Sequence, residues 1–178
     1  MNDPGRADAV ATLEVGQARL AALLTTLSDE QLSRPATIGG GDWSAKDLIG
    51  HIATWEEMAL EALEAWRDGT TPWFDQEPYV GPGSTDRINA ATIERKAGLS
   101  LQQIRTSAEQ THRQLMSSIQ ALTDEEWSSK IVWREEEITL AGRLGSLTAA
   151  VDGPFRHAFD HIPDLEVYVA SLPIGRNP

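Results

Sequence analysis

Two of the chain's four histidines, His157 and His161, stand four residues apart near the C-terminus. Four residues make a little more than one helical turn, so both imidazoles would lie on one side of a helix, about 5–6 Å apart. At that spacing two ring nitrogens can reach one metal ion. A third histidine, His51, occupies a position in an apolar helical pattern where Leu or Ile would be expected. Because histidine is the commonest metal ligand, and three imidazoles leave a coordination position open, these residues predict a metal site capable of chemistry.

Each histidine also has a simpler interpretation. His51 could be a core histidine that hydrogen-bonds to a neighbour, and His157 and His161 could form a polar helix edge. The fourth histidine, His112, lies on a different predicted helix and matches no ligand position. We expect it to pack at the surface or between helices.

Two carboxylates are candidates for orienting the metal ligands or for acting as a general base. A metal-bound histidine usually gives its second ring N–H to a carboxylate or a carbonyl. Glu56 is close to the apolar stripe of its helix, and Asp160 lies between the paired histidines. Either residue could orient a ligand or act as a general base. The alternative for both is a solvated helix face.

Aromatic residues could line a substrate pocket over the metal. The stretch from Thr70 to Thr85 is rich in Pro, Gly and aromatic residues, which is typical of a long loop. The candidate substrate-binding residues are Trp55, Trp73, Phe74 and Tyr79. The loop aromatics could equally form a core of the loop or a dimer contact.

Composition limits the classes of partner. The 178 residues carry a formal charge of −12, so we expect no nucleic acid and no anionic membrane among the partners. There is no apolar run long enough to span a bilayer and no N-terminal signal pattern, which makes cytoplasmic residence the expectation. Cysteine is absent, so a thiol used in a reaction would have to be a small molecule.

Apolar residues recur at helical spacing in four long stretches, and strand signals are almost absent. This pattern predicts a single all-α domain over residues 1–178, built as a helix bundle. Residues 129–138 are the one place where an extended segment could form. Pro154, Pro163 or both should kink the last helix. The four long helices are expected over about 6–27, 44–67, 101–122 and 139–171, with a short helix over 86–97.

Two stretches of the sequence resemble the DinB-like superfamily. The run from Trp43 to Glu56 resembles the start of that superfamily's second helix, which leads to a metal-binding histidine, here His51. The run from His157 to Asp164 resembles the His-x-x-x-His stretch of its last helix. The resemblance implies a DinB/YfiT-like four-helix bundle with a crossover connection, a three-histidine divalent metal site and often a homodimer. Residues 86–89 and the helix that contains His112 look closest to the ClbS/DfsB branch.

The residues and the resemblance together favour a metal-dependent enzyme. Zn²⁺ or Ni²⁺ would bind to the three histidines, and the open position would activate water or a low-molecular-weight thiol such as mycothiol or bacillithiol. The reaction would be hydrolysis or S-transfer on an electrophilic small-molecule substrate. One alternative is a non-catalytic protein that sequesters a reactive small molecule. Another is a bundle whose histidines are only structural.

Overall fold

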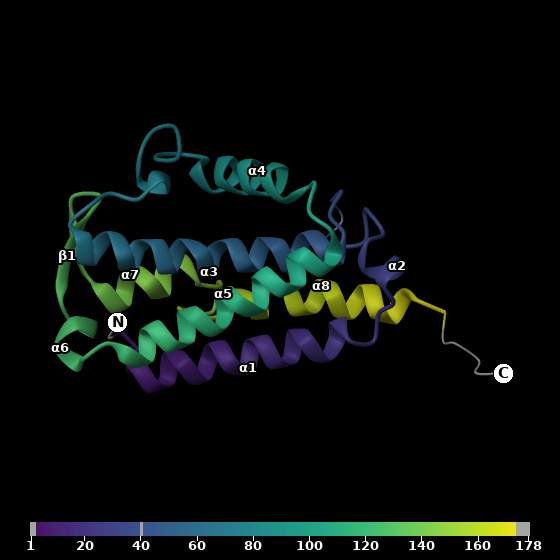
Figure 1. Ribbon diagram of the computed structural model, residues 1–178, viewed down its shortest axis with the longest axis horizontal. Helices are drawn as coiled ribbons and strands as arrows, with labels where there is room; N and C mark the ends of the chain where they lie inside the picture. The colour runs from purple at the N-terminus through teal and green to yellow at the C-terminus, as the bar shows by residue number, and fades with distance from the viewer. Residues whose placement is uncertain (1–2, 40, 174–178) are drawn as a thin grey trace.

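The long helices lie roughly along one common axis and form a bundle with four positions (Figure 1). The computed structural model describes residues 3–39 and 41–173, and 65% of the protein is helical. The predicted all-α four-helix bundle is therefore confirmed. Three long helices fill three positions of the bundle: α1 (Arg6–Leu24), α3 (Ala45–Asp68) and α5 (Leu101–Ala121). Two shorter helices, α7 (Leu140–Leu147) and α8 (His157–Ser171), share the fourth position.

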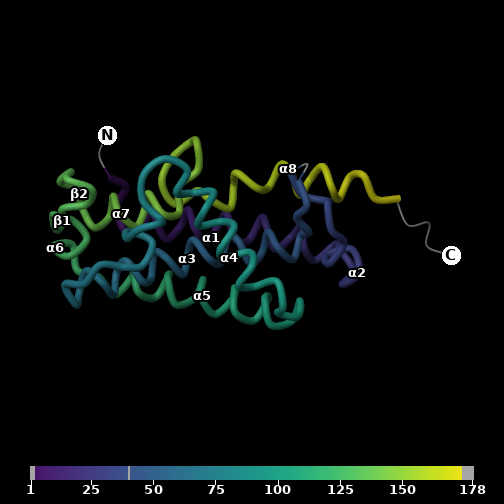
Figure 2. Tube along the Cα trace, turned by 90° about the horizontal axis from the view of Figure 1, so that it is seen from above, coloured from purple at the N-terminus to yellow at the C-terminus, as the bar shows by residue number. Residues whose placement is uncertain are grey.

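The chain crosses over between the second and third long helices. Helices α3 and α5 run in the same direction, so the chain must return along the bundle between them (Figure 1). It does so through α4 (Ser84–Lys96), which packs on the outer side of α3. Figure 2 shows α5 along one side of the bundle and the pair α7 and α8 along the opposite side. The short elements are α2 (Asp29–Leu32), η1 (Trp73–Asp75), α6 (Asp124–Trp127), β1 (Lys130–Trp133) and β2 (Glu136–Thr139).

Helix α3 is the central element, because it packs against α4, α5, α7 and α8. Ser44 and Asp47 form the predicted capping box at its N-terminus, with the Asp47 carboxylate accepting a hydrogen bond from the Ser44 N–H at 2.9 Å. Gly69, at φ 64°, ends the helix in the left-handed conformation that glycine adopts without strain. This fixed start places His51 on the buried face, two turns into the helix.

The prediction of one continuous last helix over 139–171 is wrong. Helix α7 ends at Leu147, and α8 begins at His157, where the backbone N–H donates to the Thr148 carbonyl at 2.8 Å. Between them Pro154 lacks a backbone N–H, and Phe155 has a φ of 60°, so the helical hydrogen-bond ladder cannot continue. Pro163 lies inside α8 without ending it. The helix is therefore broken beside Pro154, where a kink was one of the expected outcomes, and it continues through Pro163.

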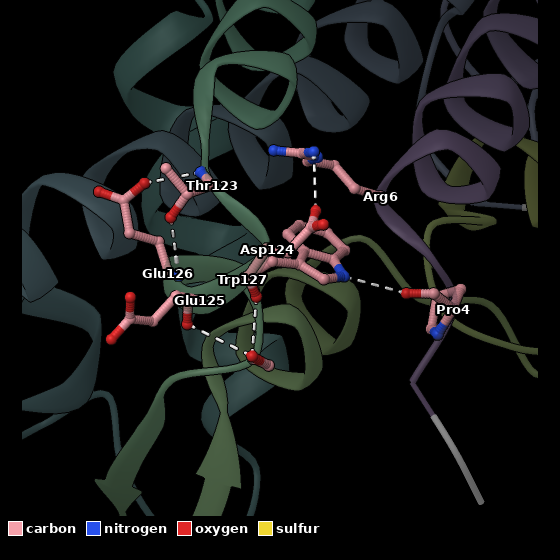
Figure 3. Close-up of polar contacts among 8 residues, drawn as sticks. Pro4, Arg6, Thr123, Asp124, Glu125, Glu126 and Trp127 are labelled. Atoms are coloured by element: carbon pink, nitrogen blue, oxygen red, sulfur yellow. Dashed lines mark hydrogen bonds and ion pairs between the residues drawn. The ribbon is translucent and has the colours of Figure 1, made fainter.

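Phe155 anchors the loop between α7 and α8 in the hydrophobic core of the bundle. This side chain is 2% exposed, and its ring stacks on Trp127 of α6 with the centroids 5.8 Å apart. Trp127 in turn donates its indole N–H to the Pro4 carbonyl at 3.1 Å, and Arg6 pairs with Asp124 at 2.9 Å (Figure 3). Trp127 thus links three parts of the chain. Its ring contacts the loop before α8, and its indole N–H bonds the N-terminal segment to α6.

A two-stranded hairpin forms where an extended segment was expected. Strands β1 and β2 pair antiparallel, with Ile131 opposite Ile138. The two residues of the turn, Arg134 and Glu135, have φ values of 50° and 69°. Both angles belong to the type of turn that matches the twist of a two-residue hairpin. None of the helices in the described ranges is long and apolar enough to cross a membrane.

Gly145→Ala should destabilise the protein. A Cβ atom at this position would lie 2.8 Å from Pro154 Cβ and 3.0 Å from the Phe155 ring, so the loop before α8 would have to move. Overpacking of this kind costs about 1–3 kcal/mol of unfolding free energy, which urea titration measures. Gly98→Ala is the control, because its Cβ would meet nothing within 4 Å. Equal stability of the two variants would contradict the tight contact.

Candidate metal centre

The three predicted ligand histidines converge in the structure. His51 lies on α3, and His157 and His161 lie on the first turns of α8. The Nε2 atom of His157 is 3.2 Å from the Nε2 atom of His51 and 3.2 Å from that of His161. One nitrogen from each of the three rings lies within 4.8 Å of the others, a spacing that could hold one metal ion.

These separations fit a tetrahedral metal ion better than a set of hydrogen bonds. A Zn–N distance of about 2.0–2.1 Å at tetrahedral angles gives nitrogen atoms about 3.3–3.4 Å apart. A ring nitrogen carries either one hydrogen atom or one lone pair. The Nε2 atom of His157 therefore cannot make two good hydrogen bonds, to His51 and to His161, at the same time. A cation at the centre would accept all three lone pairs.

The surroundings keep the three imidazoles neutral. Burial, with smaller contributions from His161 and Lys96, lowers the pKa of His51 to about 3. Burial also lowers the pKa of His157 well below its usual value, and His51 and His161 add to the effect. Burial lowers the pKa of His161 as well, although the nearby Asp160 and Asp164 oppose it. Neutral imidazole is the form that binds a metal ion.

Neither candidate carboxylate bonds directly to a ligand histidine. Glu56 is buried on α3 and pairs with His112 of α5, with Oε1 and Nδ1 2.8 Å apart. His112 thus packs between helices, as expected. The exposed Asp160 accepts a hydrogen bond from the Val151 N–H at 3.3 Å.

The outer ring nitrogens of two ligands are left without partners. The Nδ1 atoms of His51 and His157 are buried and have no hydrogen-bond partner among the described residues. A small cavity of about 10 Å³ is lined by both Glu56 and His157. A space of that size holds about one water molecule, which could join the Glu56 carboxylate to the ring of His157.

Sequence reasoning missed the lysine beside the centre. Lys96 of α4 reaches α3, where its Nζ atom donates to the Gly50 carbonyl at 3.1 Å and to Glu57 at 2.8 Å. Burial lowers the pKa of Lys96, and the pairing with Glu57 opposes this effect. No local pattern could have indicated this contact, because it depends on how α4 packs against α3.

Two tryptophans flank the histidines. The Trp43 ring lies 4.8 Å from the His51 ring, between centroids, and Trp55 lies 6.4 Å from His51 and 5.8 Å from His157. Of the four aromatic residues predicted to bind substrate, Trp55 and Phe74 line a cavity of about 180 Å³. The other two, Trp73 and Tyr79, pack on each other at 4.8 Å and do not line that cavity.

The fold is similar to three solved structures. The colibactin self-resistance protein ClbS, solved in complex with a dsDNA, is 12% identical with a TM-score of 0.77, over 94% of this chain and 97% of ClbS. The mycothiol-dependent maleylpyruvate isomerase is 16% identical with a TM-score of 0.65, over 93% of this chain and 63% of the isomerase. YfiT from Bacillus subtilis, described as a probable metal-dependent hydrolase with an unusual four-helix bundle topology, is 16% identical with a TM-score of 0.57, over 96% and 89%.

The ClbS structure corrects one expectation from composition. A protein of this fold has been crystallised with double-stranded DNA, so the exclusion of nucleic acid as a partner is wrong. The net charge of −12 is a sum over the whole chain and says nothing of charge on one face. The same similarity supports the resemblance to the ClbS/DfsB branch.

A comparison with family models identifies the chain. No curated protein gives a significant match. A model described as the DinB superfamily matches residues 12–150, a stretch that includes His51 and ends before His157 and His161. Because that match covers more than half of the sequence and the fold agrees with it, this protein belongs to the DinB superfamily.

Proposed function

We propose that this protein is a metal-dependent enzyme in which His51, His157 and His161 bind one divalent ion, Zn²⁺ or Ni²⁺. The observation that carries the proposal is the convergence of three neutral imidazoles, with the His157 nitrogen 3.2 Å from each of the other two and all three within 4.8 Å of one another. Nitrogen ligands suit both ions, and three imidazoles leave room for at least one further ligand. A bound divalent ion supplies Lewis-acid chemistry that favours deprotonation of water or of a thiol.

The chain's own residues prepare the site for that chemistry. Trp43 and Trp55 flank the histidine rings and limit the access of bulk water. Glu56 is held by His112 and faces the small cavity that it shares with His157. We place Glu56 as the group that orients His157 through a bridging water and holds a proton during turnover. Asp160 is a second candidate base, because it lies close enough to His161 to oppose the fall in its pKa.

Two reactions and one binding role fit this site. YfiT is described as a probable metal-dependent hydrolase and the isomerase as mycothiol-dependent, so hydrolysis and thiol-dependent chemistry each have an example on the same fold, which supports hydrolysis and S-transfer as candidate reactions here. ClbS is a self-resistance protein, which supports sequestration as the second candidate function. Turnover of an activated ester in water alone would select the hydrolase, and turnover that requires added mycothiol or bacillithiol would select the transferase. Stoichiometric binding without turnover would select sequestration. The homodimer implied by the resemblance stays a prediction.

Titration calorimetry with Zn²⁺ should show one site per chain that depends on His51. In His51→Ala and in His161→Ala the affinity should fall by more than the roughly 10–100-fold loss that follows removal of an outer partner. His112→Asn is the matched control, because it removes the fourth histidine, keeps an N–H that can donate to Glu56 and leaves the three ligands in place. Unchanged Zn²⁺ affinity in His51→Ala would refute the three-histidine centre.

Glu56→Gln should weaken Zn²⁺ binding by about 10–100-fold, because the partner that orients His157 loses its charge. The amide keeps an oxygen for the contact with His112, so the helix packing is preserved. Glu64→Gln, an exposed position on the same helix, is the control. If both variants bind Zn²⁺ like the wild type, Glu56 serves only to pair with His112.

The metal-free protein should lose stability as the pH falls from about 7 to about 5. In the unfolded chain each imidazole takes up a proton near pH 6.5, whereas burial holds the folded pKa values lower, so acid favours the unfolded state. Above about pH 7 these groups are neutral in both states and contribute no slope. His51→Leu removes one of them, so the melting temperature of this variant should fall less over the same range. An equal fall in both proteins would show that His51 is not held neutral.

A further inference from the structure

A buried ion pair lies at the end of the bundle where α7, η1 and the hairpin meet. Arg143 of α7 is 5% exposed, and its Nη2 atom is 2.6 Å from Oδ2 of Asp75. The other oxygen of Asp75 accepts a hydrogen bond from the Trp133 indole N–H at 3.0 Å. Both oxygens of this one carboxylate are therefore engaged, as a buried charge requires.

A second guanidinium lies beside this pair. The Cζ atom of Arg134 is 4.5 Å from the centre of the Trp133 ring, and that of Arg143 is 4.3 Å from it. Arg134 is exposed and forms no ion pair with any residue in the described ranges. Burial lowers the pKa of Arg143; Asp75 opposes this effect, and Arg134 adds to it. Because Asp75 pairs with Arg143, the three side chains Asp75, Arg134 and Arg143 together carry one net positive charge.

The four residues of this cluster all line the cavity of about 180 Å³ that Trp55 also lines. Trp55, Phe74 and Met58 are among its apolar lining residues, and Ser84, Thr85 and Ser146 supply hydroxyl groups. The charged residues of the lining are Asp75, Arg134 and Arg143. Because Asp75 is paired with Arg143, Arg134 is the cation left to bind a ligand, and the cavity suits a small molecule with an apolar body and an anionic end.

The cavity is also next to the histidines. Trp55 lines it, and the same ring makes an edge contact with His157, with the centroids 5.8 Å apart. Trp55 therefore borders both the cavity that contains Arg134 and the metal centre.

We propose that this cavity binds the carboxylate end of the small molecule on which the metal centre acts. Arg134 would donate charge-assisted hydrogen bonds to the carboxylate, and Trp55 and Phe74 would contact the apolar body. Arg143 would hold Asp75 and the Trp133 ring in place beneath Arg134. This assignment of a carboxylic acid as substrate class rests on the proposed metal-dependent function.

Phenylacetate and its neutral counterpart phenylacetamide test the assignment. In protein labelled with ¹⁵N, phenylacetate should shift the indole N–H signal of Trp133, and phenylacetamide should bind at least about tenfold more weakly, because a charge-assisted hydrogen bond contributes about 1.5–3 kcal/mol. Arg134→Gln should weaken phenylacetate binding by a similar factor and leave phenylacetamide unchanged. Arg113→Gln, which removes an exposed arginine on α5, is the control and should bind phenylacetate like the wild type. Equal affinity for the acid and the amide, or no effect of Arg134→Gln, would overturn the proposal.

The same titration in His51→Ala separates this proposal from the metal centre. If Arg134 binds the carboxylate, the affinity for phenylacetate should stay within about twofold of the wild type even though a metal ligand is gone. Loss of phenylacetate binding in His51→Ala would mean that the carboxylate binds at the metal, which overturns the cavity assignment and leaves the metal centre standing. Phenylacetate binding by a wild-type protein that binds no Zn²⁺ in the titration would support the cavity as a carboxylate site and refute the proposed metal-dependent enzyme.

Discussion

Three neutral imidazoles with their nitrogen atoms turned toward one another are the constraint on which the rest of this structure depends. Polar groups are costly to bury without partners, and here a single nitrogen of His157 faces two others at 3.2 Å. Without a cation the nitrogen lone pairs repel one another. A cation bound between the three rings would attract all three lone pairs, because they would point at one positive charge. The ligands come from α3 and α8, and His51 and His157 are 106 residues apart in sequence. Metal binding would therefore join distant parts of the bundle and stabilise the folded state.

The break in the fourth helical position sets the register of two of these ligands. Because α8 is a separate helix that begins at His157, the direction in which its side chains point is not set by the side-chain directions of α7. The first turns of α8 can therefore face α3. Two glycines allow the close packing that this requires. Gly145 leaves space for the loop that contains Phe155, and a Cβ at Gly16 of α1 would lie 2.9 Å from the ring of Phe159 on α8. The backbone of α1 thus comes close to α8 beside the histidines. The geometry of the centre therefore depends on glycine, which has no Cβ atom, at positions 16 and 145.

Local sequence was sufficient for most of the architecture and for the three histidines, but not for the break. Capping residues such as Ser44 and apolar residues at helical spacing predict the long helices because those signals act within one or two turns. The apolar spacing continues through Val151 and Phe155, which is why one continuous helix was expected. In the structure Val151 is fully exposed and Phe155 is buried through a positive φ, and a periodic pattern cannot distinguish these outcomes. The pairing of Glu56 with His112 was missed for a related reason, since it depends on how α3 packs on α5.

The distribution of charge matters more for this protein than its sum. Long-range fields from an acidic surface are screened within about 8–10 Å at physiological salt, so a net charge of −12 places little restriction on what binds in a particular cavity. ClbS bears on this for the fold, because double-stranded DNA, a partner that the net charge of the present chain argues against, was found in its crystals. Here the guanidinium of Arg134, unpaired among the described residues, lines a cavity together with Trp55, and the Trp55 ring also contacts His157. Neutral imidazoles would leave the full positive charge of a divalent ion in place. The cavity and the metal centre would then both attract anions, although the chain as a whole is acidic.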